Sequence, residues 1–145
     1  RPKSRITCCV HATINTYYVK EKRGYDNWDK VGKTDVFDVF STTILNYSLP
    51  RSYFKTITQR TVDIARKYNK GSQRWIMNYY NEPENIEEIK EIANLYKEMG
   101  VESLFAWTYR GGYGTVLAAP HALEMWDMLG EAYGEVLDET YKIKL

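Results

Sequence analysis

Apolar residues recur with two different periods along the chain, and their order predicts four strand–helix units. Runs rich in β-branched and aromatic residues, as strands are, cover residues 5–12, 36–43, 74–80 and 102–109. Helical spacing of apolar residues follows each run, over residues 27–32, 52–69, 86–99 and a final segment after Pro120. Strands that alternate with helices in this way imply a parallel sheet whose strands are joined by crossover helices.

The longer helices carry boundary signals and apolar stripes. Gly71 is expected to stop the first of them and Gly100 the second. Asn85 occupies the N-cap position of the second, with Glu88 as its capping-box partner. The stripes expected to be apolar faces comprise Tyr53, Phe54, Ile57, Ile64, Ala65 and Tyr68 in the first helix; Ile86, Ile89, Ile92, Ala93, Tyr96 and Met99 in the second; and Leu123, Trp126, Leu129 and Tyr133 in the last.

The strands present two unlike faces, which favours a closed barrel over an open sheet. In the third run, Trp75 lies on one face, whereas Asn78, and with it Glu82 beyond the strand, belongs to the other. We assign Asn78, Glu82 and His11 to a more polar barrel interior with a site at its mouth. An open flavodoxin-like sheet, in which helices cover both strand faces, is the alternative.

Four units make about half of a (β/α)8 (TIM) barrel, which takes eight strands and about 250 residues. We therefore predict an α/β half barrel, with residues 1–145 forming one domain that supplies strands five to eight. The chain opens at Arg1 without an initiator Met, which also favours a fragment. Because an isolated half would expose its interior face and two sheet edges, we expect its partner to be a missing N-terminal half or a second copy of the chain.

Composition removes several other classes of function. The 145 residues are 43% hydrophobic with a formal net charge of +1, and the scattered charges argue against nucleic-acid or anionic-membrane partners. No apolar run approaches the ~20 residues of a membrane span. Adjacent Cys8 and Cys9 would point to opposite strand faces, so we expect reduced thiols, which suit the cytoplasm but leave the compartment open. We predict no metal and no cofactor, because the Cys and His are too few and Gly111, Gly112 and Gly114 lack dinucleotide-binding spacing.

Polar and aromatic side chains gather where the predicted strands end, the edge at which barrels carry their chemistry. Glu82 is the catalytic candidate, because glycoside hydrolysis uses two carboxyl groups flanking the scissile bond. A competing interpretation is that Glu82 and Glu84 precede a helix, whose dipole favours negative charge. For Trp107, Arg110 and His11 a structural role is the competing interpretation. The residues predicted to bind substrate are Trp107, Tyr80, Asn81, Arg110, His11 and Tyr109.

Two short motifs resemble glycoside hydrolases of the clan A (β/α)8 type: Trp75-Ile-Met-Asn-Tyr-Tyr-Asn81-Glu82-Pro83 and Phe105-Ala-Trp107-Thr-Tyr-Arg110-Gly. The resemblance implies an Asn-Glu-Pro acid/base motif after the fourth strand, a nucleophilic Glu after the seventh and an active-site Trp after the eighth. The tripeptide matches the first of these. Its place before a last, Trp-bearing strand instead puts Glu82 in the nucleophile's position, which we favour because a closing helix follows.

The sequence therefore predicts half of a barrel whose parent binds or hydrolyses a saccharide. Glu82 is its expected nucleophile or general base, and Trp107 and Tyr80 are its expected sugar platforms. No second catalytic carboxylate is identifiable, so we expect the partner acid from the absent half and an inactive chain by itself. The alternatives are a non-catalytic barrel-like domain and a flavodoxin-like domain, either serving ligand binding or assembly.

Overall fold

Four strands alternate with helices in the order expected from the sequence. The computed structural model describes residues 5–11, 28–43, 49–78, 82–107, 116–118 and 120–136. Its elements are β1 (Thr7–His11), α2 (Trp28–Gly32), β2 (Val39–Thr43), α3 (Arg51–Lys67), β3 (Gly71–Met77), the 3-10 turn η2 (Pro83–Asn85), α4 (Ile86–Glu98), β4 (Ser103–Trp107), the 3-10 turn η3 (Val116–Ala118) and α5 (Ala122–Val136). The α/β class and the β-α alternation are confirmed.

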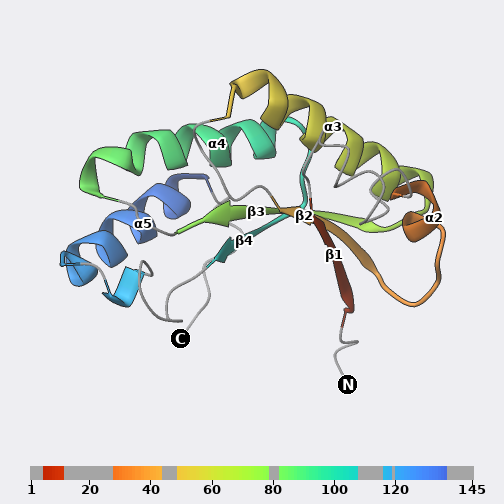
Figure 1. The fold of residues 1–145 in the computed structure, drawn as a ribbon, viewed down its shortest axis with the longest axis horizontal. Helices are drawn as coiled ribbons and strands as arrows, with labels where there is room; N and C mark the ends of the chain where they lie inside the picture. The colour runs from red at the N-terminus through yellow and green to blue at the C-terminus, as the bar shows by residue number, and fades with distance from the viewer. Residues whose placement is uncertain are drawn as a thin grey trace.

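All four strands are parallel and lie in the sheet in chain order, β1-β2-β3-β4. Both α3 and α4 cover the same face of this sheet, as Figure 1 shows. A doubly wound flavodoxin-like sheet reverses its strand order at a switch point and carries helices on both faces. Neither feature occurs among the described elements. We call the other face, which α3 and α4 leave uncovered, the open face.

The end of α3 differs from the expected one. Asn69, with a φ of 52°, takes the left-handed conformation that ends the helix, and Asn is one of the few residues that adopt it readily. Gly71, predicted as the stop, is already the first residue of β3, which begins three residues earlier than expected. Gly100, with a φ of 82°, follows α4 as predicted.

The core lies between the sheet and the helices. Phe40 of β2 and Ile76 of β3 face it, and α4 buries most of its predicted stripe against them. In α3 the buried set is Phe54, Ile57, Thr58, Thr61, Val62 and Ala65, whereas Tyr53, Ile64 and Tyr68 are only half-buried. Within these segments no helix combines the length and apolar character needed to cross a bilayer.

The predicted stripe of α5 is partly wrong. Leu123 and Trp126 are 82% and 52% exposed. Leu129 is buried as predicted, and Met125 and Ala132 are buried with it. The buried residues recur at spacings of four and three, so they form one helical stripe that is rotated from the expected one. The exposed pair leaves an apolar patch on the outer surface of this helix.

Arg74 is fully buried in the layer between the sheet and the helices, where apolar residues are the rule. Its guanidinium donates to Thr42 Oγ1 and, over 3.1 Å, to the Tyr96 hydroxyl of α4. Thr42 and Thr61 hydroxyls lie 2.7 Å apart, and Thr61 donates to the Ile57 carbonyl oxygen over 2.8 Å. A directed chain of hydrogen bonds therefore runs from β3 through β2 into α3, while the second arm reaches α4.

Burial lowers the pKa of Arg74 and raises the pKa of Tyr96, and the nearby partner opposes each shift. The Nε of Arg74 has no hydrogen-bond partner among the described residues. A buried cation of this kind depends heavily on the few acceptors that it does have, because each lost bond leaves a charged group unsatisfied.

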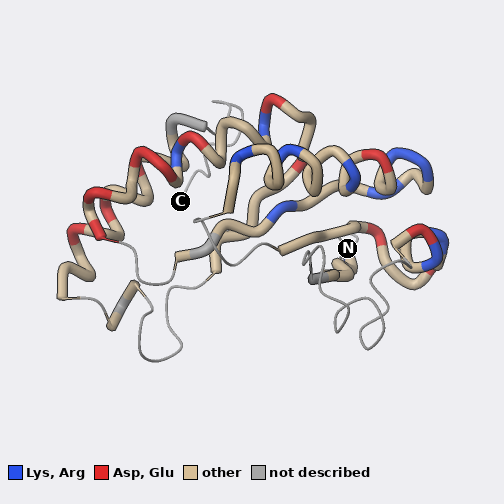
Figure 2. Tube along the Cα trace, turned by 45° about the horizontal axis from the view of Figure 1, so that its top comes forward, with Lys and Arg blue, Asp and Glu red and all other residues tan. Residues whose placement is uncertain are grey.

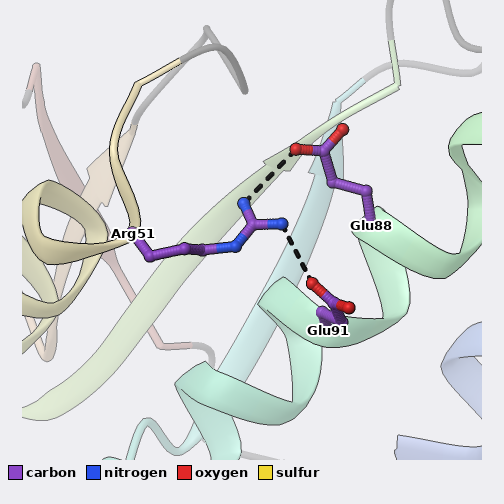
Figure 3. A network of polar contacts seen from close by, with 3 residues as sticks. All are labelled: Arg51, Glu88 and Glu91. Carbon is purple, nitrogen blue, oxygen red and sulfur yellow. Dashed lines mark hydrogen bonds and ion pairs between the residues drawn. The ribbon is translucent and has the colours of Figure 1, made fainter.

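An exposed ion-pair network joins the start of α3 to α4. Figure 3 shows the Arg51 guanidinium between two carboxylates, 3.3 Å from Glu88 and 3.0 Å from Glu91. Its three side chains are 39%, 36% and 68% exposed, so solvent screens the attraction and each pair is worth about 0–1 kcal/mol. Packing and the Arg74 bonds, rather than this network, hold α3 and α4 in place.

We expect Tyr96→Phe to lower the free energy of unfolding by about 1–3 kcal/mol, because it removes one of the few acceptors of the buried Arg74 charge. Arg74→Met, which removes the charge and keeps most of the side-chain volume, should be less harmful. Tyr133→Phe is the matched control, since its hydroxyl bonds a neutral amide. Urea unfolding of the three variants measures the order, and a Tyr96→Phe effect no larger than the control's would contradict it.

Candidate functional site

Three aromatic rings form a continuous surface on the open face. Trp75 of β3 lies 4.7 Å from Phe105 and 5.3 Å from Trp107, between ring centroids, and the last two are 6.3 Å apart. The register pairs Trp75 with Phe105 and Met77 with Trp107, so the group reaches the carboxyl end of the sheet. Phe105 and Trp107 are 41% and 40% exposed. We call Trp75, Phe105 and Trp107 the aromatic platform.

A row of hydrogen-bonded polar side chains lies next to the aromatic platform on the same face of the sheet. The Trp75 Nε1–H donates to Ser41 Oγ over 2.8 Å, and Ser41 donates to Gln73 Oε1 over 3.0 Å. The Gln73 amide in turn donates to Ser103 Oγ over 3.3 Å. Ser41, Gln73 and Ser103 are paired in register across three strands. The row fixes the orientation of the Trp75 ring. Ser41 is fully buried within it, whereas Gln73 and Ser103 are half-buried beside the rings.

The two faces of β3 are the reverse of the predicted ones. Asn78, expected in the barrel interior, is buried on the helix side, where its Oδ1 accepts a hydrogen bond from the Tyr133 hydroxyl of α5 over 2.8 Å. Burial raises the pKa of Tyr133, so it stays a donor. Trp75 lies on the open face instead. Pattern alone misled here because a polar Arg74 and Asn78 occupy the buried side.

Glu82 stands at the N-cap of η2, five residues after Met77, the last residue of β3. Its backbone N–H donates to Asn85 Oδ1 over 3.0 Å, and its carbonyl oxygen accepts from the Asn85 N–H over 2.9 Å. Glu82 is exposed. Its backbone is therefore held by a tight cap, and its catalytic role stays a prediction.

Asn85 does precede α4 directly, as expected, but it does not cap that helix through its side chain. Its amide oxygen bonds Glu82 instead, and the predicted capping-box partner Glu88 pairs with Arg51. The 3-10 turn between Glu82 and the helix accounts for the change, because it brings the Asn85 side chain close to the backbone N–H of Glu82. The N-cap interpretation of Asn85 is thus wrong in its chemistry and right in its position.

The other predicted site residues lie outside the described part of the chain. These are Tyr80, Asn81, Tyr109 and Arg110, together with the side chain of His11. The His11 backbone ends β1 and is paired with Thr43, so the described strand ends do share one edge of the sheet. Trp107 is the one predicted substrate-binding side chain that the structure describes, and Trp75 and Phe105 are the members of its group that sequence reasoning missed.

Cys9 also faces the open side, where its register partner is Ser41. Although part of Cys9 is exposed, desolvation of its thiol by the surrounding groups raises the pKa to about 11, while the hydrogen bond to Ser41 acts in the opposite direction. At neutral pH the group is therefore a thiol and not a reactive thiolate. Among the residues described, no group of three His, Cys, Asp or Glu is arranged to hold a metal ion.

A small apolar pocket of about 180 Å³ lies on the opposite, helix-facing side of β3 and β4. It is lined by Ile76, Leu104, Ala106 and Tyr133. Leu104 and Ala106 belong to the last strand of the sheet, and Ala106 is exposed. The pocket is therefore a partly uncovered stretch of β4 rather than a polar site.

Comparison of the chain with protein families, with curated proteins and with solved structures found no match in any of the three.

We expect alkylation of Cys9 in a Cys8→Ser background to follow a pH profile with a midpoint near the thiol's pKa of about 11. At pH 8 the thiolate fraction is then ~0.1%, well below that of an ordinary thiol with a pKa near 8.5. Iodoacetamide labelling followed by mass spectrometry gives the rates. The urea-unfolded chain supplies the reference, and equal midpoints in the two states would contradict the expectation.

Proposed function

We propose that this chain is the C-terminal half of a glycoside hydrolase-like (β/α)8 barrel and that it binds a saccharide at the carboxyl end of its sheet. The aromatic platform carries the proposal. Ligand sites combine aromatic surface with a few placed polar groups, and here two half-exposed rings adjoin the Ser41–Gln73–Ser103 row. The indole face of Trp107 would stack on a sugar ring, and polar groups near it would take hydroxyls.

The barrel part of the proposal is supported by the topology. A (β/α)8 barrel repeats parallel strands in chain order, with every crossover helix on the outer face. The four strands here follow that order, with α3 and α4 on one face only. Aromatic and polar side chains then occupy the face that would become the interior, and the strand ends would form part of its mouth.

In this proposal Glu82, which follows β3, is the nucleophile or general base. The partner acid comes from the other half, since glycoside hydrolysis needs two carboxyl groups. Trp107 and Tyr80 are the sugar platforms. Further substrate contacts are assigned to Asn81, Tyr109, Arg110 and His11.

Saccharide binding should depend on Trp107. We expect a panel of cello-, manno-, xylo- and chito-oligosaccharides to contain at least one ligand whose dissociation constant rises about tenfold or more in Trp107→Ala, equivalent to about 1.4 kcal/mol. Isothermal titration calorimetry measures the constants. Trp126→Ala, which removes a 52% exposed indole from α5, is the matched control and should bind as the parent does. Equal losses of affinity in both variants, or no saccharide binding by the unmutated chain, would refute the proposal.

A non-catalytic saccharide-binding domain is the second candidate. It is favoured by the position of Glu82 at the N-cap of η2, where its backbone is held by Asn85. A carboxylate at such a position is also explained by the partial positive charge at a helix start. Binding would be the same in both cases, and only hydrolysis separates them.

The catalytic version requires aryl-glycoside hydrolysis by the complete barrel, because this chain by itself lacks the partner acid; that hydrolysis should fall by about 10²–10⁴-fold in Glu82→Gln, the range for loss of an acid–base group. Glu84→Gln, which removes an exposed carboxylate two residues away, is the control and should retain the parent's rate. Release of nitrophenol from a set of nitrophenyl glycosides is the assay. If the complete barrel binds oligosaccharides while every glycoside stays intact, the non-catalytic function stands and the catalytic one falls.

A further inference from the structure

Trp107 occupies an end of the sheet where a side chain has few neighbours. It is the last residue of β4, which is an edge strand of the described sheet, and it is 40% exposed. A side chain at such a place ordinarily loses rotamer freedom when a ligand stacks on it, and this loss costs affinity. The cost is avoided if a neighbour already holds the ring before the ligand binds.

Trp75 is such a neighbour. Its ring centroid lies 5.3 Å from that of Trp107, with 28° between the ring planes, so the two indoles are stacked. Trp75 pairs in register with Phe105, and Trp107 stands two residues further along β4, a diagonal position that large aromatic side chains reach. Trp75 therefore packs against one side of the Trp107 indole and leaves the exposed part of that residue for a ligand.

Ser41 in turn fixes the Trp75 ring. The Trp75 Nε1–H donates to Ser41 Oγ over 2.8 Å, and Ser41 has no exposed surface. Because the Ser41 hydroxyl donates to Gln73 Oε1 over 3.0 Å, its lone pairs stay available to the indole N–H. Trp75 is itself half-buried. A ring held by packing and by a hydrogen bond to a buried partner keeps one orientation, and stacking transmits that orientation to Trp107.

Stacking, rather than charge, is what the strands offer to a ligand. Among the described strand residues the only Lys, Arg, Asp or Glu is Arg74, which is buried on the helix side. Figure 2 shows most of the acidic and basic residues on the helices. An uncharged sugar would therefore gain affinity at the strands mainly from the exposed ring, so the orientation of that ring should matter.

We propose that Trp75 is a positioning residue for Trp107 and that Ser41 sets its orientation, so that the Trp107 indole is already placed for stacking before a saccharide binds. This role rests on the proposed saccharide binding and adds two residues behind the ring that contacts the sugar. Neither of the two needs to touch the ligand. Ser41 is the cleaner probe, because a residue without exposed surface changes the affinity only through its neighbours.

Circular dichroism without saccharide tests the geometry. Two closely stacked indoles give coupled bands of opposite sign, and we assign this couplet to Trp75 and Trp107, so Trp107→Ala should abolish it. Ser41→Ala keeps all three platform rings and should weaken the couplet. Ser72→Ala is the matched control, because Ser72 is another buried serine of the sheet whose hydroxyl bonds backbone groups instead of a ring. An unchanged couplet in Ser41→Ala overturns the orienting role of Ser41.

Calorimetric titration tests the effect on binding, with the oligosaccharide whose affinity falls in Trp107→Ala. Ser41→Ala should raise the dissociation constant by about two- to tenfold, the range for ordering one side chain on binding, and Ser72→Ala should leave it unchanged. Trp75→Phe removes the donor of the same hydrogen bond, so in that background Ser41→Ala should raise the dissociation constant no further. Effects of the two changes that multiply independently would show that Ser41 does not act through Trp75.

The outcomes separate this role from the function on which it rests. If the unmutated chain binds no saccharide, both fall. If binding depends on Trp107 but Ser41→Ala, still unfolding cooperatively in urea, binds as the unmutated chain does, the positioning role alone falls. Trp75→Phe takes the place of Ser41→Ala if that variant does not fold, and an unchanged dissociation constant in Trp75→Phe equally overturns the role.

Discussion

Arg74 places a guanidinium group between the sheet and two helices, where its side chain has no exposed surface. A charge in that layer is tolerated only if acceptors are fixed around it. Here the acceptors come from β2 and α4, through Thr42 and Tyr96, and Thr42 continues the chain to Thr61 of α3. These bonds therefore fix the positions of β2, β3, α3 and α4 relative to one another. Because residues alternate along a strand, burying Arg74 also puts Trp75 on the opposite face, so this one side chain decides what the open face displays.

The same residue explains how far the sequence could be interpreted. Periodicity located all four strands and the long helices, since most of their apolar positions do face the core, as Ile89 and Ile92 do. It reversed the faces of β3, where Arg74 and Asn78 are polar yet buried and Trp75 is apolar yet on the open side. Polarity predicts burial only while polar groups lack internal partners. The partners of these two, Tyr96 and Tyr133, come from helices 22 and 55 residues away, and no local pattern reveals them.

The candidate site was likewise predicted from the sequence only in part. Glu82 and Trp107 were found as strand-end residues, which requires only a correct strand boundary. Phe105 and Trp75 were missed because their role depends on register, which pairs them across β3 and β4. Local boundary chemistry was also beyond the pattern: Asn85 and Glu88 fit a capping box in sequence, but each has a better partner in space, Glu82 and Arg51. Competition among partners is settled by the fold and not by spacing.

Closure into eight strands would divide the open face into two zones. Interiors of eight-stranded barrels are filled by side chains in layers, so residues midway along the strands would pack against those of the other half. By register the Ser41–Gln73–Ser103 row lies two residues before Phe105, which is midway along β4, whereas Trp107 is the last residue of that strand. Of the two half-exposed platform rings, Trp107 alone would then stay at the mouth, with Glu82 beyond the end of β3. The residues that pack against the other half and the ring proposed to bind sugar thus lie at different depths of the same strands, and closure would leave Trp107 accessible.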